Sequence, residues 1–263
     1  MSPSESSVPI ENVLGIPICA MTMDQVSSLV DRTIADRNRL QIGVVNAAKI
    51  VNMRRNEALR DDVMSSDIIL ADGASVVWAS RMLGRPLPER VAGIDLMLRM
   101  FRSGNENRYR VFCLGATDDV LEKATARLVA DYPNLELVGW HNGYFRTEEE
   151  PAVADQIIAA KPDILLVAMS SPKKEKFLAR WSEKLNVPVC HGVGGSFDVL
   201  AGKVQRAPER WQRLGLEWLY RLLQEPGRLW RRYLVTNTIF CGLVFLEFLR
   251  GIPGRFKRNF EGP

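Results

Sequence analysis

Residues 163–195 read DILLVAMSSPKKEKFLARWSEKLNVPVCHGVGG, and this stretch decides the fold. Two short apolar runs, DILLVAM at 163–169 and VPVCHGVG at 187–194, flank SPKKEKFLARWSEKLN at 171–186, which repeats apolar residues at helical spacing. Two apolar strands joined by a crossover helix make a parallel βαβ unit. The stretch therefore predicts a parallel sheet covered by helices.

The same alternation of apolar runs and amphipathic stretches extends over most of the chain. Further runs are IGVV at 42–45, DIIL at 67–70, YRVFCLG at 109–115 and LELVGW at 135–140. We therefore expect an α/β domain over residues 1–202, with a Rossmann-like, largely parallel sheet and crossover helices.

The composition changes after residue 202. Residues 203–263 are helical in pattern, aromatic and basic, with 12 Lys/Arg against 5 Glu, although the whole chain has a net charge of only +4. The most apolar part, residues 233–249, is interrupted by polar residues and is shorter than the ~20 residues of a membrane-spanning helix. We expect a C-terminal helical appendage that lies on an anionic membrane surface and binds no nucleic acid. A core-packing or dimer-forming helix is the alternative.

Two further features of the sequence bear on cellular location and on the role of the cysteines. The polar N-terminus, MSPSESSVPIEN, does not resemble a secretory signal, which favours the cytoplasm. Cys19, Cys113, Cys190 and Cys241 are far apart, and three lie in apolar runs, so we expect buried core residues and neither a disulfide nor a metal set.

Polar residues follow several of the predicted strands. Asp72 comes after DIILA and before Gly73, at a strand end where open α/β sheets keep their ligands. Asn46 follows IGVV, and the glycine-rich GVGGSFD at 192–198 follows VPVC, so these ends converge on one edge. Asp-Gly is also common in turns and helix caps, and position alone leaves both roles open for Asp72.

The sequence disfavours several kinds of nucleotide chemistry. The glycine cluster does not match GxGxxG, and no GxxxxGK[ST] loop occurs, which argues against dinucleotide binding, kinases and ATPases. There is no D-x-D triplet, and neither histidine has a neighbouring ligand partner, so we expect no metal site and no cofactor. A diphosphate leaving group would then need cations or helix N-termini.

Seven ordered segments resemble the WecG/TagA/CpsF family of bacterial glycosyltransferases, glycosyltransferase family 26. They are VVNAAKI (44–50), DGASVVWASRMLGRPLPERVAGIDL (72–96), FCLGAT (112–117), GWHNGYF (139–145), SSPKKEKF (170–177), GVGGSFDVLAGKVQRAP (192–208) and GLEWLYRLLQEPGRLWRR (215–232).

This resemblance implies an inverting, metal-independent enzyme that transfers a sugar from a UDP-sugar to an undecaprenyl-diphosphate-linked saccharide. Such products feed surface or exopolysaccharides. Together with the basic appendage and the polar N-terminus, this predicts a peripheral enzyme on the cytoplasmic face of the plasma membrane. At the matching positions, Asp72 is the expected general base, and Asn46 and Arg90 line the same pocket.

The resemblance also implies a UDP site built from the sheet domain and the appendage. Its expected residues are Gly143, Tyr144, Lys174, Asp198, Arg221, Arg228 and Arg231.

Two departures from the family pattern leave the donor sugar open. Lys174 stands where many members have Gln in P-K-Q-E, and Val44 stands where many have Thr in Thr-x-Asn.

Two rival functions are a membrane-associated nucleotide-sugar-binding protein without turnover, and a nucleotide-sugar epimerase or dehydrogenase. A homo-oligomer in solution is a weaker expectation.

Overall fold

The computed structural model describes the backbone of residues 8–258 and the side chains in that range except those of residues 228 and 251–258. Six strands form one fully parallel sheet in the order β4-β3-β8-β7-β5-β6. Each strand corresponds to one predicted apolar run, which confirms the α/β, Rossmann-like expectation. Their bounds are β3 (Leu40–Val45), β4 (Ile68–Ala71), β5 (Arg110–Gly115), β6 (Glu136–His141), β7 (Ile164–Ala168) and β8 (Val189–Gly192).

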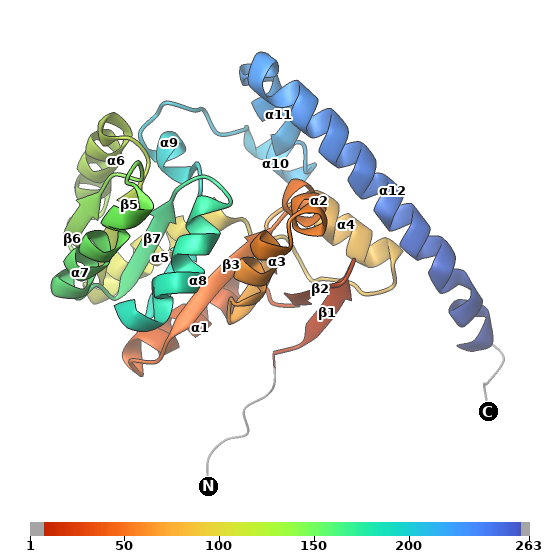
Figure 1. The fold of residues 1–263 in the computed structure, drawn as a ribbon, viewed down its shortest axis with the longest axis horizontal. Helices are drawn as coiled ribbons and strands as arrows, with labels where there is room; N and C mark the ends of the chain where they lie inside the picture. The colour runs from red at the N-terminus through yellow and green to blue at the C-terminus, as the bar shows by residue number, and fades with distance from the viewer. Residues whose placement is uncertain (1–7, 259–263) are drawn as a thin grey trace, which may run out of the picture.

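Helices cover both faces of the sheet and make three layers (Figure 1). One face packs against α1 (Met23–Ala35), α5 (Gly93–Asn107), α6 (Asp118–Asp131) and α9 (Ser196–Leu200). The other face packs against α2 (Ala47–Arg55), α3 (Glu57–Met64), α4 (Ala74–Met82), α7 (Glu150–Ala160) and α8 (Lys173–Leu185), and the short 3₁₀ helix η1 (Thr147–Glu149) precedes α7.

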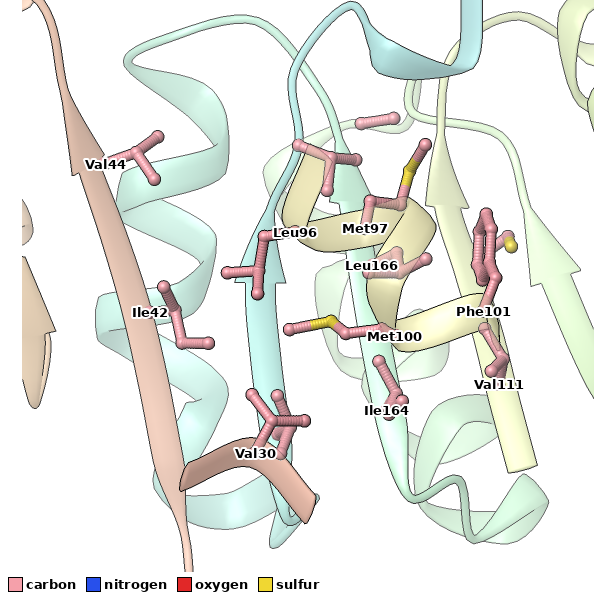
Figure 2. Close-up of a cluster of buried hydrophobic side chains, with 14 of the residues drawn as sticks. Val30, Ile42, Val44, Leu96, Met97, Met100, Phe101, Val111, Ile164 and Leu166 are labelled. Atoms are coloured by element: carbon pink, nitrogen blue, oxygen red, sulfur yellow. The ribbon is translucent and has the colours of Figure 1, made fainter. Parts of the chain in front are cut away.

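Alternate residues of each strand supply the two core layers. Ile164 and Leu166 of β7 lie with Leu96 and Met100 of α5 (Figure 2), whereas Leu165 belongs to the cluster beneath α7 and α8. Side chains on a strand alternate between its faces, so a continuous apolar run fits a strand that is buried on both sides.

A small hairpin beside β4 was not predicted. Its strands, β1 (Ile10–Val13) and β2 (Ile16–Cys19), pair antiparallel around Leu14 and Gly15, which both have positive φ, at 54° and 80°. Two positive φ angles in a two-residue loop match the twist of the flanking strands.

The expectation that the cysteines are buried core residues is confirmed for three of them and wrong for Cys241. Cys19, Cys113 and Cys190 are buried in β2, β5 and β8, and all four cysteines are free, with Cys241 exposed. Burial raises the pKa of Cys113 and of Cys190 to about 12, so both stay protonated thiols.

The predicted C-terminal appendage is helical. It consists of α10 (Glu209–Arg213), α11 (Glu217–Gln224) and the long α12 (Pro226–Arg258). Helix α12 lies along α2 (Figure 1), where Phe240 and Val244 join the core cluster and Glu247 accepts a 2.9 Å hydrogen bond from Arg85. The core-packing alternative therefore holds for one face of α12. The predicted boundary at residue 202 stays a prediction.

The expectation that the tail is too short to span a membrane is wrong on length. Residues 229–250 form a 22-residue helical stretch whose most apolar 18-residue window has mean hydropathy 1.4, long and apolar enough to cross a bilayer by those criteria alone. Only 17% of its most apolar window is buried, so most of this helix faces outward.

Candidate functional site

Asp72 lies at the carboxyl edge of the sheet, directly after β4, and is half-buried. Its backbone N–H donates to Val45 O, and its Oδ1 accepts a 2.9 Å hydrogen bond from the N–H of Gly93, the first residue of α5. Among the side chains and backbone groups that the structure describes, none donates a hydrogen bond to Oδ2. One carboxylate oxygen is thus anchored at a helix N-terminus, where negative charge is favoured, and the other is available.

Asn46 lies next to Asp72 at the end of β3. Its Oδ1 accepts a 3.0 Å hydrogen bond from Lys49 N and caps α2. A Cβ on Gly73 would stand 3.1 Å from the Asn46 Cβ, so the two strand ends are in contact. Asn46 Oδ1 therefore caps α2, and the side-chain NH₂ group is the part that can bind a ligand.

Arg90 joins the sheet domain to the appendage. Its guanidinium pairs with Glu217 at the start of α11 and approaches Asp95 Oδ2 at 3.5 Å. Arg206 completes this four-residue network with a 2.5 Å hydrogen bond to Asp95 and a 3.8 Å approach to Glu217. It also lines a groove of about 470 Å³ between α5 and the loop after α9. Arg90 therefore holds α11 against the sheet domain. It also lies three residues before Gly93, whose N–H binds Asp72.

The glycine-rich loop after β8 brings core and appendage together. The guanidinium of Arg221 lies 3.4 Å, and the Asp198 carboxylate 3.6 Å, from where a Cβ on Gly195 would stand. Asp198 is also 3.9 Å from the Lys203 ammonium. Two of the predicted UDP residues, Asp198 and Arg221, thus flank the same loop.

Lys174 lies beneath that loop and is buried. Its Nζ approaches Gly192 O at 3.5 Å and Glu175 Oε1 at 3.7 Å, and Lys49 donates to the same Glu175 oxygen at 2.7 Å. Burial, reinforced by the nearby Lys49 charge, lowers the pKa of Lys174 to about 8. Asp72 is close enough to act on this ammonium electrostatically. A buried cation therefore lies beneath the loop and within electrostatic reach of the proposed base.

Gly143 and Tyr144 follow β6, the edge strand farthest from β4, but their segment turns back toward the middle of the sheet edge. Gly143 N–H donates to Ala116 O at 2.9 Å, and a Cβ on Gly143 would stand 2.9 Å from Met169 Cγ, directly after β7. Lys173 donates to Gly143 O at 2.8 Å and also to Phe145 O, which fixes this segment, while Tyr144 is 80% exposed. These contacts place Gly143 at the carboxyl ends of β5 and β7.

The remaining predicted arginines are in α12. Arg231 is exposed on that helix. Arg228 also belongs to α12, but its side chain lies outside the described ones. The role of each predicted site residue stays a prediction.

One buried residue beside Asp72 was missed as a site residue. His191 in β8 is completely buried, and its Nε2 lies 3.2 Å from Gly93 O. Burial lowers the pKa of His191 to about 4, so the ring is neutral. A histidine in an apolar strand, directly before a glycine-rich loop, was the available signal.

Several helices begin at this edge, which makes it electropositive. Helices α2, α4, α6 and α8 each start within a few residues of a strand's carboxyl end, and α5 starts where the Gly93 N–H meets Asp72. Helix N-termini present free N–H groups and positive partial charge. In the part of the chain that the structure describes, no group of three His, Cys, Asp or Glu side chains is arranged to hold a metal ion. The edge therefore suits an anionic ligand such as a diphosphate.

A comparison against known families identifies the family of this chain. The family model "Glycosyl transferase WecG/TagA/CpsF family" matches residues 11–253. The chain therefore belongs to the WecG/TagA/CpsF family of glycosyl transferases.

Curated relatives carry the name N-acetylglucosaminyldiphosphoundecaprenol N-acetyl-beta-D-mannosaminyltransferase. The protein from Bacillus spizizenii is 41% identical over 170 residues, 65% of each chain, and that from Bacillus subtilis is 39% identical over 66% of this chain and 67% of its own. The Staphylococcus aureus (strain MW2) protein is 35% identical over 84% of this chain and 87% of its own. The match thus spans just under two thirds of the length of the Bacillus spizizenii relative.

Proposed function

We propose that this chain transfers a sugar from a UDP-sugar to an undecaprenyl-diphosphate-linked saccharide, with inversion and without a metal ion. The observation that carries the proposal is Asp72. It lies at the carboxyl edge of the sheet, in a chain that matches a glycosyl transferase family over residues 11–253, with one carboxylate oxygen available. The names of the relatives supply the acceptor class, an N-acetylglucosaminyl diphosphoundecaprenol.

In the proposed reaction, Asp72 Oδ2 accepts the proton of an acceptor hydroxyl as that oxygen attacks the anomeric carbon. The bond from this carbon to the diphosphate oxygen breaks, and UDP leaves with the bonding electron pair. A single displacement inverts the anomeric configuration. General-base assistance of this kind is worth ~10²–10⁴ in rate, and Gly93 N–H keeps the base oriented.

The leaving diphosphate would be stabilised without a metal ion. The glycine-rich loop can bring backbone N–H groups close to phosphate, Lys174 lies beneath it, and Arg221 lies over it. Arg228 and Arg231 of α12 are proposed to complete the set. Preorganised cations aimed at developing charge are an effective source of transition-state stabilisation.

We place the enzyme peripherally on the cytoplasmic face of the plasma membrane, held by α12. The exposed face of this helix carries Leu234, Phe245, Leu246 and Leu249, and its other face packs on the sheet domain through Phe240 and Val244. A helix packed along a water-soluble domain cannot at the same time be surrounded by lipid, which favours an interfacial helix over a spanning one. The polysaccharide product rests on the family resemblance, whereas a homo-oligomer in solution rests on exposed apolar surface.

The test is UDP release from a panel of UDP-sugars in the presence of N-acetylglucosaminyl diphosphoundecaprenol, with the lipid product analysed by mass. We expect UDP and a lipid-linked disaccharide in equal amounts, also in the presence of EDTA. Binding of a UDP-sugar with no UDP release would identify the non-catalytic rival. A changed sugar still attached to UDP would identify the epimerase or dehydrogenase.

A further inference from the structure

His191 is a buried titratable side chain within electrostatic reach of the proposed base, and the mechanism above does not use it. It lies in the central part of the sheet, on β8, with no exposed surface. A histidine in such a place loses hydration and needs a polar partner to offset that loss. Its partner is the carbonyl oxygen of Gly93, at 3.2 Å from Nε2.

Gly93 connects His191 to Asp72. Its N–H donates to Asp72 Oδ1 at 2.9 Å, and its carbonyl accepts from the imidazole, so the first residue of α5 is held from two sides. Gly93 is also buried, and its segment is held further by the hydrogen bond from Val91 N to Ala71 O. The carboxylate position therefore depends on where α5 begins, and the imidazole fixes that point.

We propose that His191 is a positioning residue for catalysis: its Nε2–H holds Gly93 so that the Gly93 N–H orients the Asp72 carboxylate toward the acceptor hydroxyl. The inference rests on the proposed function, because it assigns His191 to the base of that reaction.

The protonation state of His191 suits this task. The Gly93 carbonyl can only accept, so Nε2 carries a proton. Burial and the nearby Lys174 keep the imidazole neutral, with a pKa of about 4. A neutral donor fixes the helix start without adding a positive charge that would weaken Asp72 as a base.

The experiment compares His191→Gln with His191→Asn. The Gln amide nitrogen reaches about as far as Nε2, whereas the Asn amide nitrogen reaches only about as far as Nδ1. Both are neutral amides, so the two variants differ in how far the N–H reaches and not in charge. We expect His191→Asn to lower kcat by about 10²-fold, the cost of a small misplacement of a catalytic group. The KM for the UDP-sugar and the Kd for UDP should stay within about twofold. His191→Gln should recover most of the lost kcat.

Equal kcat values for the two folded variants, or a loss of UDP affinity that parallels the loss of kcat, would overturn the inference. Asp72→Asn is assayed alongside. If Asp72→Asn is inactive and the two His191 variants are equal, only this inference fails, whereas an active Asp72→Asn overturns the proposed function itself.

If substitution of His191 prevents folding, a second pair of variants at Gly93 tests the same link to Asp72. Gly93→Pro removes the N–H that holds Asp72, at the first helical position where proline is tolerated, and Ala92 already has the extended backbone that precedes proline. Gly93→Ala keeps the N–H, and its Cβ would meet His191 only at 3.5 Å, an ordinary contact. We expect the proline variant to lose about 10²-fold in kcat and the alanine variant far less. Equal losses would overturn the inference.

Discussion

The carboxyl edge of the sheet and the C-terminal appendage contribute differently to the site. At the edge, Asp72, Lys174 and His191 are buried or half-buried and each contacts a neighbouring backbone group. In the appendage, Arg221 and Arg231 are exposed. The difference suggests that the core holds the reacting groups in place in advance, whereas the appendage supplies adaptable charge for UDP and an apolar face for the membrane. Each prediction below tests this division.

Among the variants that compare the two regions, the largest effect is expected from the appendage arginines. Arg221→Gln combined with Arg231→Gln should lower kcat/KM by about 10²-fold, because each charge-assisted hydrogen bond to phosphate is worth about 1.5–3 kcal/mol. The melting temperature should not change, because both side chains are exposed. UDP titration and steady-state assays measure these quantities, with Arg213→Gln on exposed α10 as the control. Unchanged UDP affinity would show that the core alone holds the donor.

The apolar face of α12 should control membrane binding. Phe245→Ser with Leu246→Ser removes two exposed apolar side chains, and we expect vesicle affinity to fall at least tenfold in co-sedimentation with anionic vesicles. Val129→Ser, at an exposed site on α6, is the matched control. Equal binding of both variants would separate α12 from the membrane.

Arg90 should link the two regions. If it acts by holding α11, Arg90→Gln and Glu217→Gln should each lower kcat/KM by about tenfold, and the double variant should be no worse than either single one. A double-mutant cycle in the UDP-release assay measures this coupling. Additive losses would instead mean that Arg90 acts on the substrate independently of Glu217.

The smallest expected effect concerns Lys174 and stability. Burial lowers its pKa from 10.5 to about 8, so between these values the unfolded chain binds more protons and the folded state gains stability as pH rises. Because of Lys174, the free energy of unfolding measured in urea should be about 1 kcal/mol higher at pH 9 than at pH 7. Lys174→Gln should lose that increase, and the exposed Lys176→Gln should keep it. A variant Lys174→Gln with the full increase would contradict the burial of this charge.

All six sheet strands were predictable from the sequence because each is a short apolar run between amphipathic stretches. The carboxyl edge followed, since parallel strands end together, and this placed Asp72, Asn46 and the glycine-rich loop near one another. The pairing of Arg90 with Glu217 joins residues 127 positions apart, and no spacing rule reports such a contact. His191 was noticed only as a possible metal ligand, because its partner is a backbone carbonyl, and its position before the glycine-rich loop was the one signal in the sequence. The packing of α12 on α2 was likewise hidden, because an apolar helix face fits a core and a membrane equally well.

The most direct test of the central claim is Asp72→Asn, which keeps the size of the side chain and the acceptor for Gly93 N–H but removes the base. UDP release with lipid acceptor and UDP affinity are measured on the same preparation. We predict that turnover falls by at least about 10²-fold while the Kd for UDP stays within about twofold. A variant that keeps more than half of the wild-type turnover would contradict the assignment of Asp72 as the base.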